Sequence, residues 1–328
     1  MPGGELLRVS DLSLDYVSPQ GVVHALNGVN LSLNRSQLLG IVGESGSGKS
    51  TLAYALTRLL PRNALYRSGQ VLFDGISILD LPEAKLRGIR GKRITMVFQD
   101  PMTSLNPLFK IKDQIGRVLE LHRGAEKKEA LRLAADYLRA VELPDPELVL
   151  DAYPFQLSGG MQQRVMIAMA LSTQPDLIIA DEPTSAVDAT IQVQILELLS
   201  RLRHELDFSM LFITHSLDVV SAVCDSIVVM YAGRMVETGS VSDIFSSPKH
   251  PYTQALFAAI PRPRRDSSEP KTLKSISGSP PDLRSLPAGC KFHPRCPFVF
   301  DKCRAEDPML RQVSPGHEVS CHLYKGGE

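Results

Sequence analysis

A glycine-rich stretch at residues 43–51 has the residue types and the spacing that bind a chain of phosphates. It fits the pattern G-x-x-x-x-G-K-[ST] and consists of Gly43, Glu44, Ser45, Gly46, Ser47, Gly48, Lys49, Ser50 and Thr51. Glycines allow a tight turn that points several backbone N–H groups into one concavity, and a helix that begins near Lys49 adds its positive dipole end. Lys49 can reach the outer phosphates, and the Ser50 hydroxyl can bind Mg²⁺. The sequence therefore predicts a bound nucleotide with Mg²⁺.

A pair of carboxylates follows an apolar run later in the chain. Asp181 and Glu182 come directly after residues 177–180, which have the composition of a buried strand. Phosphate loops work with a metal-binding acid at the end of another strand. We therefore predict that Asp181 binds Mg²⁺ and that Glu182 acts as the general base for the attacking water. An acidic pair after a strand is common on protein surfaces, and the phosphate loop is what favours a functional reading here.

A second glycine-rich helix start lies at residues 157–164, which read LSGGMQQR. Ser158 is a good N-cap, and Gly159 and Gly160 leave backbone N–H groups accessible ahead of an apolar helix. Such a helix start can bind an anion. An ordinary capped helix would look the same, and these residues alone do not indicate whose phosphate the site would meet.

Four cysteines are concentrated in the last part of the chain, at Cys290, Cys296, Cys303 and Cys321. Four thiolates can bind either a tetrahedral Zn²⁺ or a [4Fe–4S] cluster. The absence of a C-x-x-C pair weakens the zinc interpretation. A proline directly follows Cys296, as a proline often follows a cysteine that binds an iron–sulfur cluster. His293 and His322 flank the cysteines and are alternative ligands, although solvated loop histidines would look the same.

The elements that position these groups can be read from the apolar pattern. Alternating runs predict strands at 6–16 and 22–33 and within 69–98, and short apolar runs predict strands at 177–180, 210–214 and 227–230. Helical spacing with charged residues between predicts an amphipathic helical region at 111–142. Strands that alternate with helices indicate a mostly parallel sheet covered on both faces. From about residue 246, many prolines predict an irregular linker that leads to the cysteines.

Composition and charge exclude several classes of protein. Apolar residues make up 43% of the chain, which argues against intrinsic disorder. The 36 basic residues balance 36 acidic ones, so we expect no nucleic-acid partner. No apolar run is long enough to cross a membrane, and the start of the chain lacks the pattern of a signal peptide. We expect a cytoplasmic protein that reaches a membrane only through a partner.

In their order along the chain, these motifs resemble the ATP-binding subunits of ABC transporters. The motifs are GESGSGKST at 43–51, Gln99, LSGGMQQR at 157–164, LIIADE at 177–182, Asp188 and His215. The resemblance covers about residues 5–245 and implies an ATPase with a nucleotide-binding domain at 1–245. Its fold would be of the α/β class, a P-loop NTPase (RecA-like) core with an antiparallel β subdomain and an α-helical subdomain at about 101–170.

The resemblance also implies roles for single residues. Two such subunits would close head to tail, with each ATP between the phosphate loop of one and Ser158, Gly159, Gly160 and Gln163 of the other. Tyr16 would stack on adenine. Gln99 would contact Mg²⁺ or water and sense the membrane subunits, and His215 would contact the γ-phosphate. Asp188 would help to join the two subunits. Val187 and Ser216 replace a Leu and an Asp that are common in the family, and neither change removes a catalytic group.

Residues 98–107, residues 247–256 and the terminal cysteines narrow the resemblance to the dipeptide/oligopeptide importer ATPases, of which nickel importers are close relatives. It implies a C-terminal extension at 246–328 and, at its four cysteines, a [4Fe–4S] cluster, with Zn²⁺ as the alternative. The implied partners are a second ABC ATPase subunit (a paralogue rather than a second copy), two transmembrane permease subunits and an extracytoplasmic solute-binding protein. The chain would then lie peripherally at the cytoplasmic face of the cell membrane.

Other functions stay open within this resemblance. The same motor could drive nickel or oligosaccharide import. A soluble, non-transport ABC ATPase is an alternative of another class. DNA-repair members carry long coiled coils between the phosphate loop and the signature, whereas Lys49 and Ser158 are only 109 positions apart. Translation members carry two cassettes, and we find one. A redox or metal sensor with a secondary ATPase is the third possibility.

Overall fold

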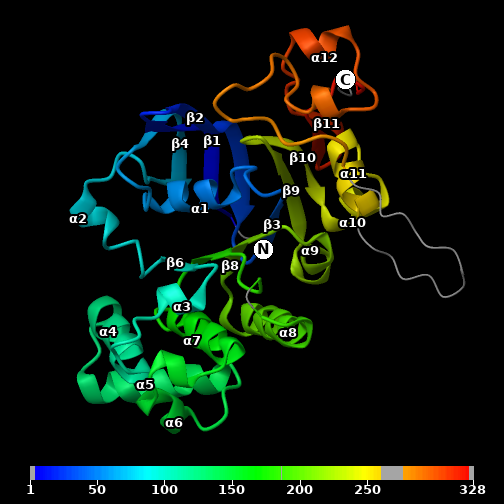
Figure 1. Cartoon of the computed structure of the whole chain (residues 1–328). Coiled ribbons are helices and arrows are strands. Elements are labelled where there is room, and N and C mark those ends of the chain that lie inside the picture. The colour runs from blue at the N-terminus through cyan, green and yellow to red at the C-terminus, as the bar shows by residue number, and fades with distance from the viewer. Residues whose placement is uncertain (1–3, 186, 260–275, 325–328) are drawn as a thin grey trace, which may run out of the picture.

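The structure, a computed structural model, describes residues 4–185, 187–259 and 276–324 of the chain. β-Sheet occupies the centre of Figure 1, with a group of helices at the lower left and the C-terminal region, in orange and red, at the upper right. Two sheets form within the described residues, and they confirm the predicted α/β class.

The central sheet supplies the strand ends at which the candidate site lies. In sheet order, its strands are β11 (Arg311–Ser314), β12 (His317–Val319), β10 (Arg234–Ser240), β9 (Ser226–Tyr231), β3 (Leu38–Val42), β8 (Ser209–Thr214), β7 (Leu177–Asp181) and β6 (Ile94–Val97). The run from β9 to β6 is parallel, whereas β10, β12 and β11 pair antiparallel. The prediction of a mostly parallel sheet is confirmed.

Successive residues of the central strands pack into different cores, as the period of two in a strand requires. In β7, Leu177 and Ile179 belong to one apolar cluster, and Ile178 and Ala180 belong to the other. The sheet is therefore covered on both faces, which explains why these strands read as continuous apolar runs.

An antiparallel sheet packs on one of those faces. Its strands, in sheet order, are β2 (Gly21–Asn34), β1 (Glu5–Ser18), β4 (Ala64–Phe73) and β5 (Ile76–Ser77). The predicted strands at 6–16 and 22–33 are confirmed as β1 and β2. Their inward residues, such as Leu12, Leu14 and Val29, share a core with the central sheet.

Helices cover the remaining surfaces. The α-helices are α1 (Lys49–Thr57), α2 (Glu83–Leu86), α3 (Pro101–Ser104), α4 (Ile111–Arg123), α5 (Lys127–Ala140), α6 (Pro146–Asp151), α7 (Gly159–Leu171), α8 (Ala189–Leu206), α9 (Leu217–Val223), α10 (Val241–Ser246), α11 (Pro251–Ala259) and α12 (Asp301–Ala305). Two short 3₁₀ helices are η1 (Pro154–Gln156) and η2 (His293–Arg295). The predicted helical region at 111–142 is confirmed as two helices, α4 and α5. They are separated at Gly124, which ends α4 in a left-handed conformation with φ of 65°.

The linker predicted from about residue 246 is partly wrong. Residues 251–259 form α11, which begins at Pro251, a position in the first turn where a proline costs no backbone hydrogen bond. Residues 260–275, which include Pro261, Pro263 and Pro270 of the predicted linker, lie outside the described residues.

Strands β11 and β12 form a C-terminal hairpin. The hairpin is joined to the rest of the central sheet through β12, which pairs with β10. The pairing is reinforced by Glu237, whose side chain is fully buried. Its carboxylate accepts hydrogen bonds from the backbone N–H groups of Lys249 and His250 and lies 2.7 Å from Nε2 of His317. A buried carboxylate with this many donors is fully hydrogen-bonded, as burial requires.

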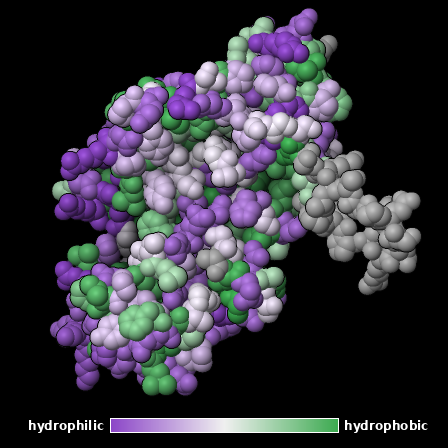
Figure 2. All heavy atoms as spheres, viewed as in Figure 1, coloured by the Kyte–Doolittle hydropathy of each residue, from purple (hydrophilic) through white to green (hydrophobic). Residues whose placement is uncertain are grey.

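Hydrophilic and hydrophobic residues are interspersed on the face shown in Figure 2. Among the described helices, none is both long and apolar enough to cross a membrane.

Candidate functional site

The phosphate loop connects β3 to α1, at the carboxyl end of a central parallel strand. Two of its glycines are required by close packing. A Cβ atom at Gly43 would lie 2.3 Å from the carbonyl oxygen of Met230, and one at Gly48 would lie 2.8 Å from that of Ala25. Gly48 also has φ of 101°, which side-chain-bearing residues rarely adopt. The predicted loop therefore takes a shape that these glycines permit.

Lys49 lies inside the loop. Its Nζ donates hydrogen bonds to the carbonyl oxygens of Gly43 at 2.8 Å and Glu44 at 3.0 Å. Lys49 is only 5% exposed, and this burial lowers the pKa of its amine, an effect that the nearby Glu182 and Asp181 oppose. The lysine therefore holds the two ends of the turn together and places a cation where phosphates would enter.

Ser50 and Asp181 form an oxygen-rich pair beside the loop. The Ser50 hydroxyl donates to Oδ1 of Asp181 at 3.1 Å, and Asp181 is 2% exposed at the end of β7. Burial raises the pKa of the Asp181 carboxyl, because it penalises the charged form. A hydroxyl and a carboxylate are ligands that Mg²⁺ prefers, so this pair fits the predicted metal ion.

Glu182 is contacted by two other predicted residues. Nε2 of Gln99 donates to Oε2 of Glu182 at 3.0 Å, and Nδ1 of His215 lies 3.3 Å from Oε1. The three residues follow β7, β6 and β8, which are adjacent parallel strands. Glu182 has φ of 47°, and its N–H donates to the carbonyl oxygen of Ile213. The backbone is thus tied to β8 while the carboxylate remains at the site.

Tyr16 of β1 lies beside the phosphate loop. Its hydroxyl donates to Oγ1 of Thr51 at 3.4 Å. The structure therefore brings the predicted adenine-stacking residue to the start of α1, although this contact is made by the hydroxyl and not by the ring face.

The second glycine-rich helix start is separate from this cluster. Ser158 is the N-cap of α7, and its Oγ accepts from the N–H of Met161. Ser158 and Gly159 are exposed, and Gly160 packs so closely against α8 that a Cβ atom would lie 2.9 Å from Cγ2 of Ile191. Within the described part of the chain, no hydrogen bond joins this turn to the phosphate loop.

Two further predicted residues lie near that turn. Asp188 is exposed, and its carboxylate caps α8 by accepting from the N–H groups of Thr190 and Ile191. Gln163 is 1% exposed on the inner side of α7. Its Nε2 lacks a hydrogen-bond partner among the described residues.

The structure adds residues to the loop that the sequence did not indicate. Arg295 of η2 forms an ion pair with Glu44, and the hydroxyl of Tyr252 in α11 accepts from the N–H of Glu44. Arg295 and Glu44 are 251 positions apart. Neither Arg295 nor Tyr252 belongs to a phosphate-binding motif, so no local pattern could have indicated them.

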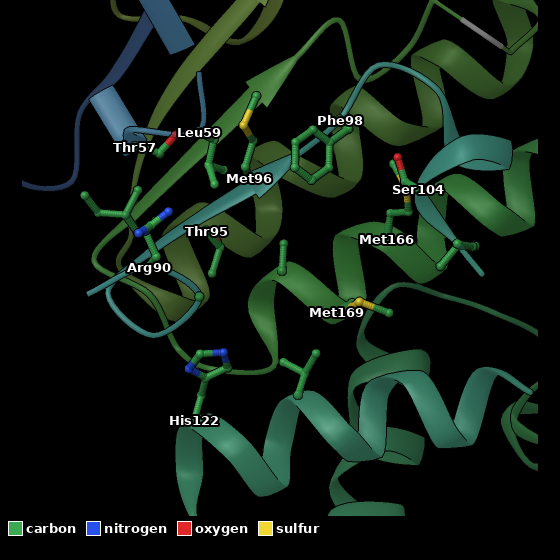
Figure 3. Close-up of a pocket in the computed structure, with 15 residues that line it drawn as sticks. Thr57, Leu59, Arg90, Thr95, Met96, Phe98, Ser104, His122, Met166 and Met169 are labelled. Carbon is green, nitrogen blue, oxygen red and sulfur yellow. The ribbon is translucent and has the colours of Figure 1, made fainter. Parts of the chain in front are cut away.

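A mostly apolar pocket of about 260 Å³ lies between β6 and the helices α4 and α7. Figure 3 shows Met96 and Phe98 on one side and Met166 and Met169 of α7 on the other, with His122 of α4 at one end. Phe98, which lines the pocket, directly precedes Gln99 of the cluster around Glu182.

The four terminal cysteines come together. All four line one very small cavity with a volume of about 10 Å³. Even so, among the described residues no group of three or more His, Cys, Asp or Glu side chains is arranged to hold a metal ion. His293 and His322 each have one ring nitrogen hydrogen-bonded to a backbone carbonyl, of Cys290 and of Glu306. Cys224 is a separate buried thiol that packs near Gly40.

Known protein families match both ends of this architecture. The model of the ABC transporter family matches residues 26–185, and that of the oligopeptide/dipeptide transporter C-terminal region matches residues 236–303. The oligopeptide transport ATP-binding protein OppD of Salmonella typhimurium is 46% identical over 98% of this chain and 94% of its own. The chain belongs to the ABC transporter family of ATP-binding subunits. It is an ATPase with the P-loop NTPase fold that the phosphate loop indicates.

Other relatives agree with this assignment. OppD of Haemophilus influenzae is 47% identical over 97% of both chains, and the dipeptide transport protein DppD of Escherichia coli is 42% identical over 97% of this chain and 96% of its own. Among solved structures, the dimeric ATP-binding cassette MJ0796 bound to ADP and Pi matches with a TM-score of 0.64 and 31% identity. It covers 72% of this ABC ATPase and 98% of its own chain. ATP and Mg²⁺ are therefore the expected ligands of the loop.

Proposed function

We propose that this ABC ATPase powers a membrane importer of dipeptides or oligopeptides. The observation that carries the proposal is the sequence similarity to OppD and DppD, which extends over nearly the whole chain at 46% and 42% identity. The names of these two relatives assign them to oligopeptide and dipeptide transport. The separate match of residues 236–303 to the C-terminal region of that transporter group supports it. The solute would be bound by other subunits, so this chain supplies the ATP-driven step.

The proposed chemistry follows from the positions of the side chains. Lys49 and the amides of the loop would neutralise the outer phosphates of ATP, and Ser50 with Asp181 would bind Mg²⁺, which withdraws charge from those phosphates when it is bound. Glu182 would accept the proton of the attacking water. Gln99 donates a hydrogen bond to that carboxylate and would hold it in place, and His215 beside it would contact the γ-phosphate.

The second half of the ATP site would come from a partner subunit. Ser158 and Gly159 are exposed at the start of α7 and are not joined to the phosphate loop of their own chain. We propose that they meet, with Gly160, Gln163 and Asp188, the ATP bound by a second ABC ATPase, and that this partner is a paralogue. The dimeric state of the MJ0796 cassette supports a paired arrangement.

The apolar pocket beside Gln99 is the proposed contact for the permease subunits. Its walls come from β6, α4 and α7, so a segment seated there would touch the residues that follow β6. The side chains of Met102, Leu108 and Phe109 are exposed in the chain after Gln99, where a permease could cover them. This contact would hold the chain peripherally at the cytoplasmic face of the membrane, in a complex with two permeases and an extracytoplasmic solute-binding protein.

We propose that residues 1–245 form the nucleotide-binding domain, with a helical subdomain at about 101–170, and that residues 246–328 form the extension. Within the extension, Cys290, Cys296, Cys303 and Cys321 would bind a [4Fe–4S] cluster, with Zn²⁺ as the alternative. The four cysteines line one small cavity, although among the described residues no three of them are arranged to hold a metal ion. Assays of iron, acid-labile sulfide and zinc on anaerobically purified protein test this, and zinc alone, or none of the three, would reject the cluster.

Transport is tested with the complex purified from detergent-solubilised membranes and reconstituted into vesicles. We expect ATP-dependent uptake of labelled dipeptides or oligopeptides, and no uptake when the complex carries Glu182→Gln. Nickel and an oligosaccharide are tried in parallel, and uptake of either one without peptide uptake would replace the proposed cargo. If an active ATPase purifies with no permease subunits, the chain is a non-transport ABC ATPase.

A further inference from the structure

A buried arginine of the C-terminal extension reaches the phosphate loop. Nη1 of Arg295 lies 2.8 Å from Oε2 of Glu44, and Nη2 lies 3.1 Å from Oε1. The Arg295 side chain is 4% exposed, and Glu44 is 26% exposed. A bidentate ion pair between a guanidinium and a carboxylate fixes the distance and the relative orientation of the two groups. The side chain of the second residue of the loop is therefore held by a segment far away in the sequence.

The backbone of the same loop residue is held by a second part of the extension. The N–H of Glu44 donates to the hydroxyl of Tyr252 at 2.8 Å. Tyr252 is fully buried, and its ring packs on Tyr231 and Phe292, with ring centroids 4.6 Å and 5.4 Å apart. Arg295 also donates to the hydroxyl of Tyr231. This aromatic cluster gives Tyr252 a fixed position against the loop.

Glu44 in turn determines the shape of the loop and the place of Lys49. Its carbonyl oxygen accepts one hydrogen bond from Nζ of Lys49 and another from the N–H of Ser47. A displacement of Glu44 would therefore move the lysine and the turn that carries the phosphate-binding amides.

Arg295 is also part of the segment that carries the four cysteines. It directly precedes Cys296, and the N–H of Arg295 donates to the carbonyl oxygen of Phe292. Cys290 donates through its N–H to the carbonyl oxygen of Cys303, which closes the segment. The position of the guanidinium thus depends on how the cysteine segment, residues 290–303, is folded.

We propose that Arg295 is a positioning residue for ATP binding, which couples the folding of the cysteine segment to the affinity of the phosphate loop through Glu44. Such coupling acts in both directions, so ATP in the loop stabilises the cysteine segment as much as that segment favours ATP. The proposal rests on the assignment of the loop as the ATP site.

The test is a cycle of variants in the purified full-length protein, with binding of a non-hydrolysable ATP analogue as the readout. We expect Arg295→Met to weaken binding about tenfold, within the usual range of coupling between sites. In a Glu44→Gln background the same substitution should have no further effect. Tyr252→Phe removes only the hydroxyl and should also weaken binding.

Arg284→Met is the matched control, because Arg284 is a half-exposed arginine of the same extension that pairs with Asp282. It should bind the analogue as the unaltered protein does. Equal loss in Arg284→Met and Arg295→Met, or fully additive effects of Arg295→Met and Glu44→Gln, would overturn the proposal. Lys49→Ala distinguishes failure of the ATP-site assignment from failure of the coupling proposal. Retained binding in that variant would reject the ATP site itself.

Amide hydrogen exchange gives a second readout that does not depend on turnover. The ATP analogue should slow exchange in residues 290–303 of the unaltered protein and have less effect in Arg295→Met at saturating analogue. If the analogue does not change the exchange rate of this segment in the unaltered protein, the coupling is rejected. This outcome can be measured even if Arg295→Met proves too unstable to study.

Discussion

The carboxyl of Asp181, the proposed Mg²⁺ ligand, lies in an environment that is unfavourable for its charge. It is buried at the end of β7, and burial raises its pKa. The folded protein therefore binds a proton at this group more readily than the unfolded chain does. Above the ordinary pKa of an aspartate, the ionised group lowers the free energy of unfolding. This destabilisation disappears as the pH falls below that pKa.

We predict that Asp181→Asn stabilises the nucleotide-free protein at neutral pH while it abolishes Mg²⁺-dependent ATP hydrolysis. The gain should be about 1 kcal/mol, a typical value for relief at a functional site. Denaturant unfolding at several pH values measures it, and the gain should shrink toward acid pH. A variant that is less stable than the unaltered protein at neutral pH would show that the contact with Ser50 outweighs the burial of charge.

Glu182 is the residue on which hydrolysis should depend most. Its carboxylate lies between Gln99 and His215. In Glu182→Gln the amide cannot accept a proton, so ATP should still bind while steady-state hydrolysis falls by roughly 10²- to 10⁴-fold. Turnover close to that of the unaltered protein would mean that another group activates the water.

At the scale of elements, β10 and β12 are held together by the buried Glu237. Both of its carboxylate oxygens accept hydrogen bonds from backbone N–H groups, and one also lies near His317. An amide at this position would turn an N–H group toward another donor.

We predict that Glu237→Gln lowers the free energy of unfolding by about 2 kcal/mol, the usual cost of a buried donor left unpaired. Denaturant unfolding and limited proteolysis of the C-terminal region measure the effect. Glu318→Gln, on the partly exposed face of β12, is the control and should unfold as the unaltered protein does. Equal stability of the two variants would contradict the role of Glu237.

Much of the site could be predicted because its parts are contiguous in sequence. Lys49, Asp181 and Glu182 each lie in or next to a strand-end motif, and parallel strands bring such ends to one edge of the sheet. The contact of Arg295 with Glu44 could not be predicted, because it depends on the path of the chain through the extension. Helix α11 was missed because prolines suggested an irregular segment, although Pro251 lies at its first position.

At the scale of the whole molecule, the exposed turn at Ser158 predicts an assembly. Because this turn is not hydrogen-bonded to the phosphate loop of its own chain, a bulky cation in it should leave ATP binding by the single chain intact. It should block the face that would meet the partner.

We predict that Ser158→Arg binds ATP as the unaltered protein does but fails to pair with its partner ATPase in the presence of ATP. Light scattering on the purified subunits, carried out in the Glu182→Gln background to prevent turnover, measures the pairing. Persistent ATP-dependent pairing would place the subunit interface elsewhere. Loss of ATP binding without the partner would mean that the substitution disturbs the fold around α7.

The pairing of β12 with β10 limits how this protein can be recombined with other ABC ATPases. A chimera joined at residue 245 would set β10 and Glu237 of one chain against the β12 and the backbone donors of another, and a mismatch would leave β10 as a sheet edge and Glu237 without its donors. Unprotected edges of this kind promote aggregation. Exchanges of the extension between transporters should therefore transplant β10 with it, and should carry Glu44 and Arg295 as a matched pair.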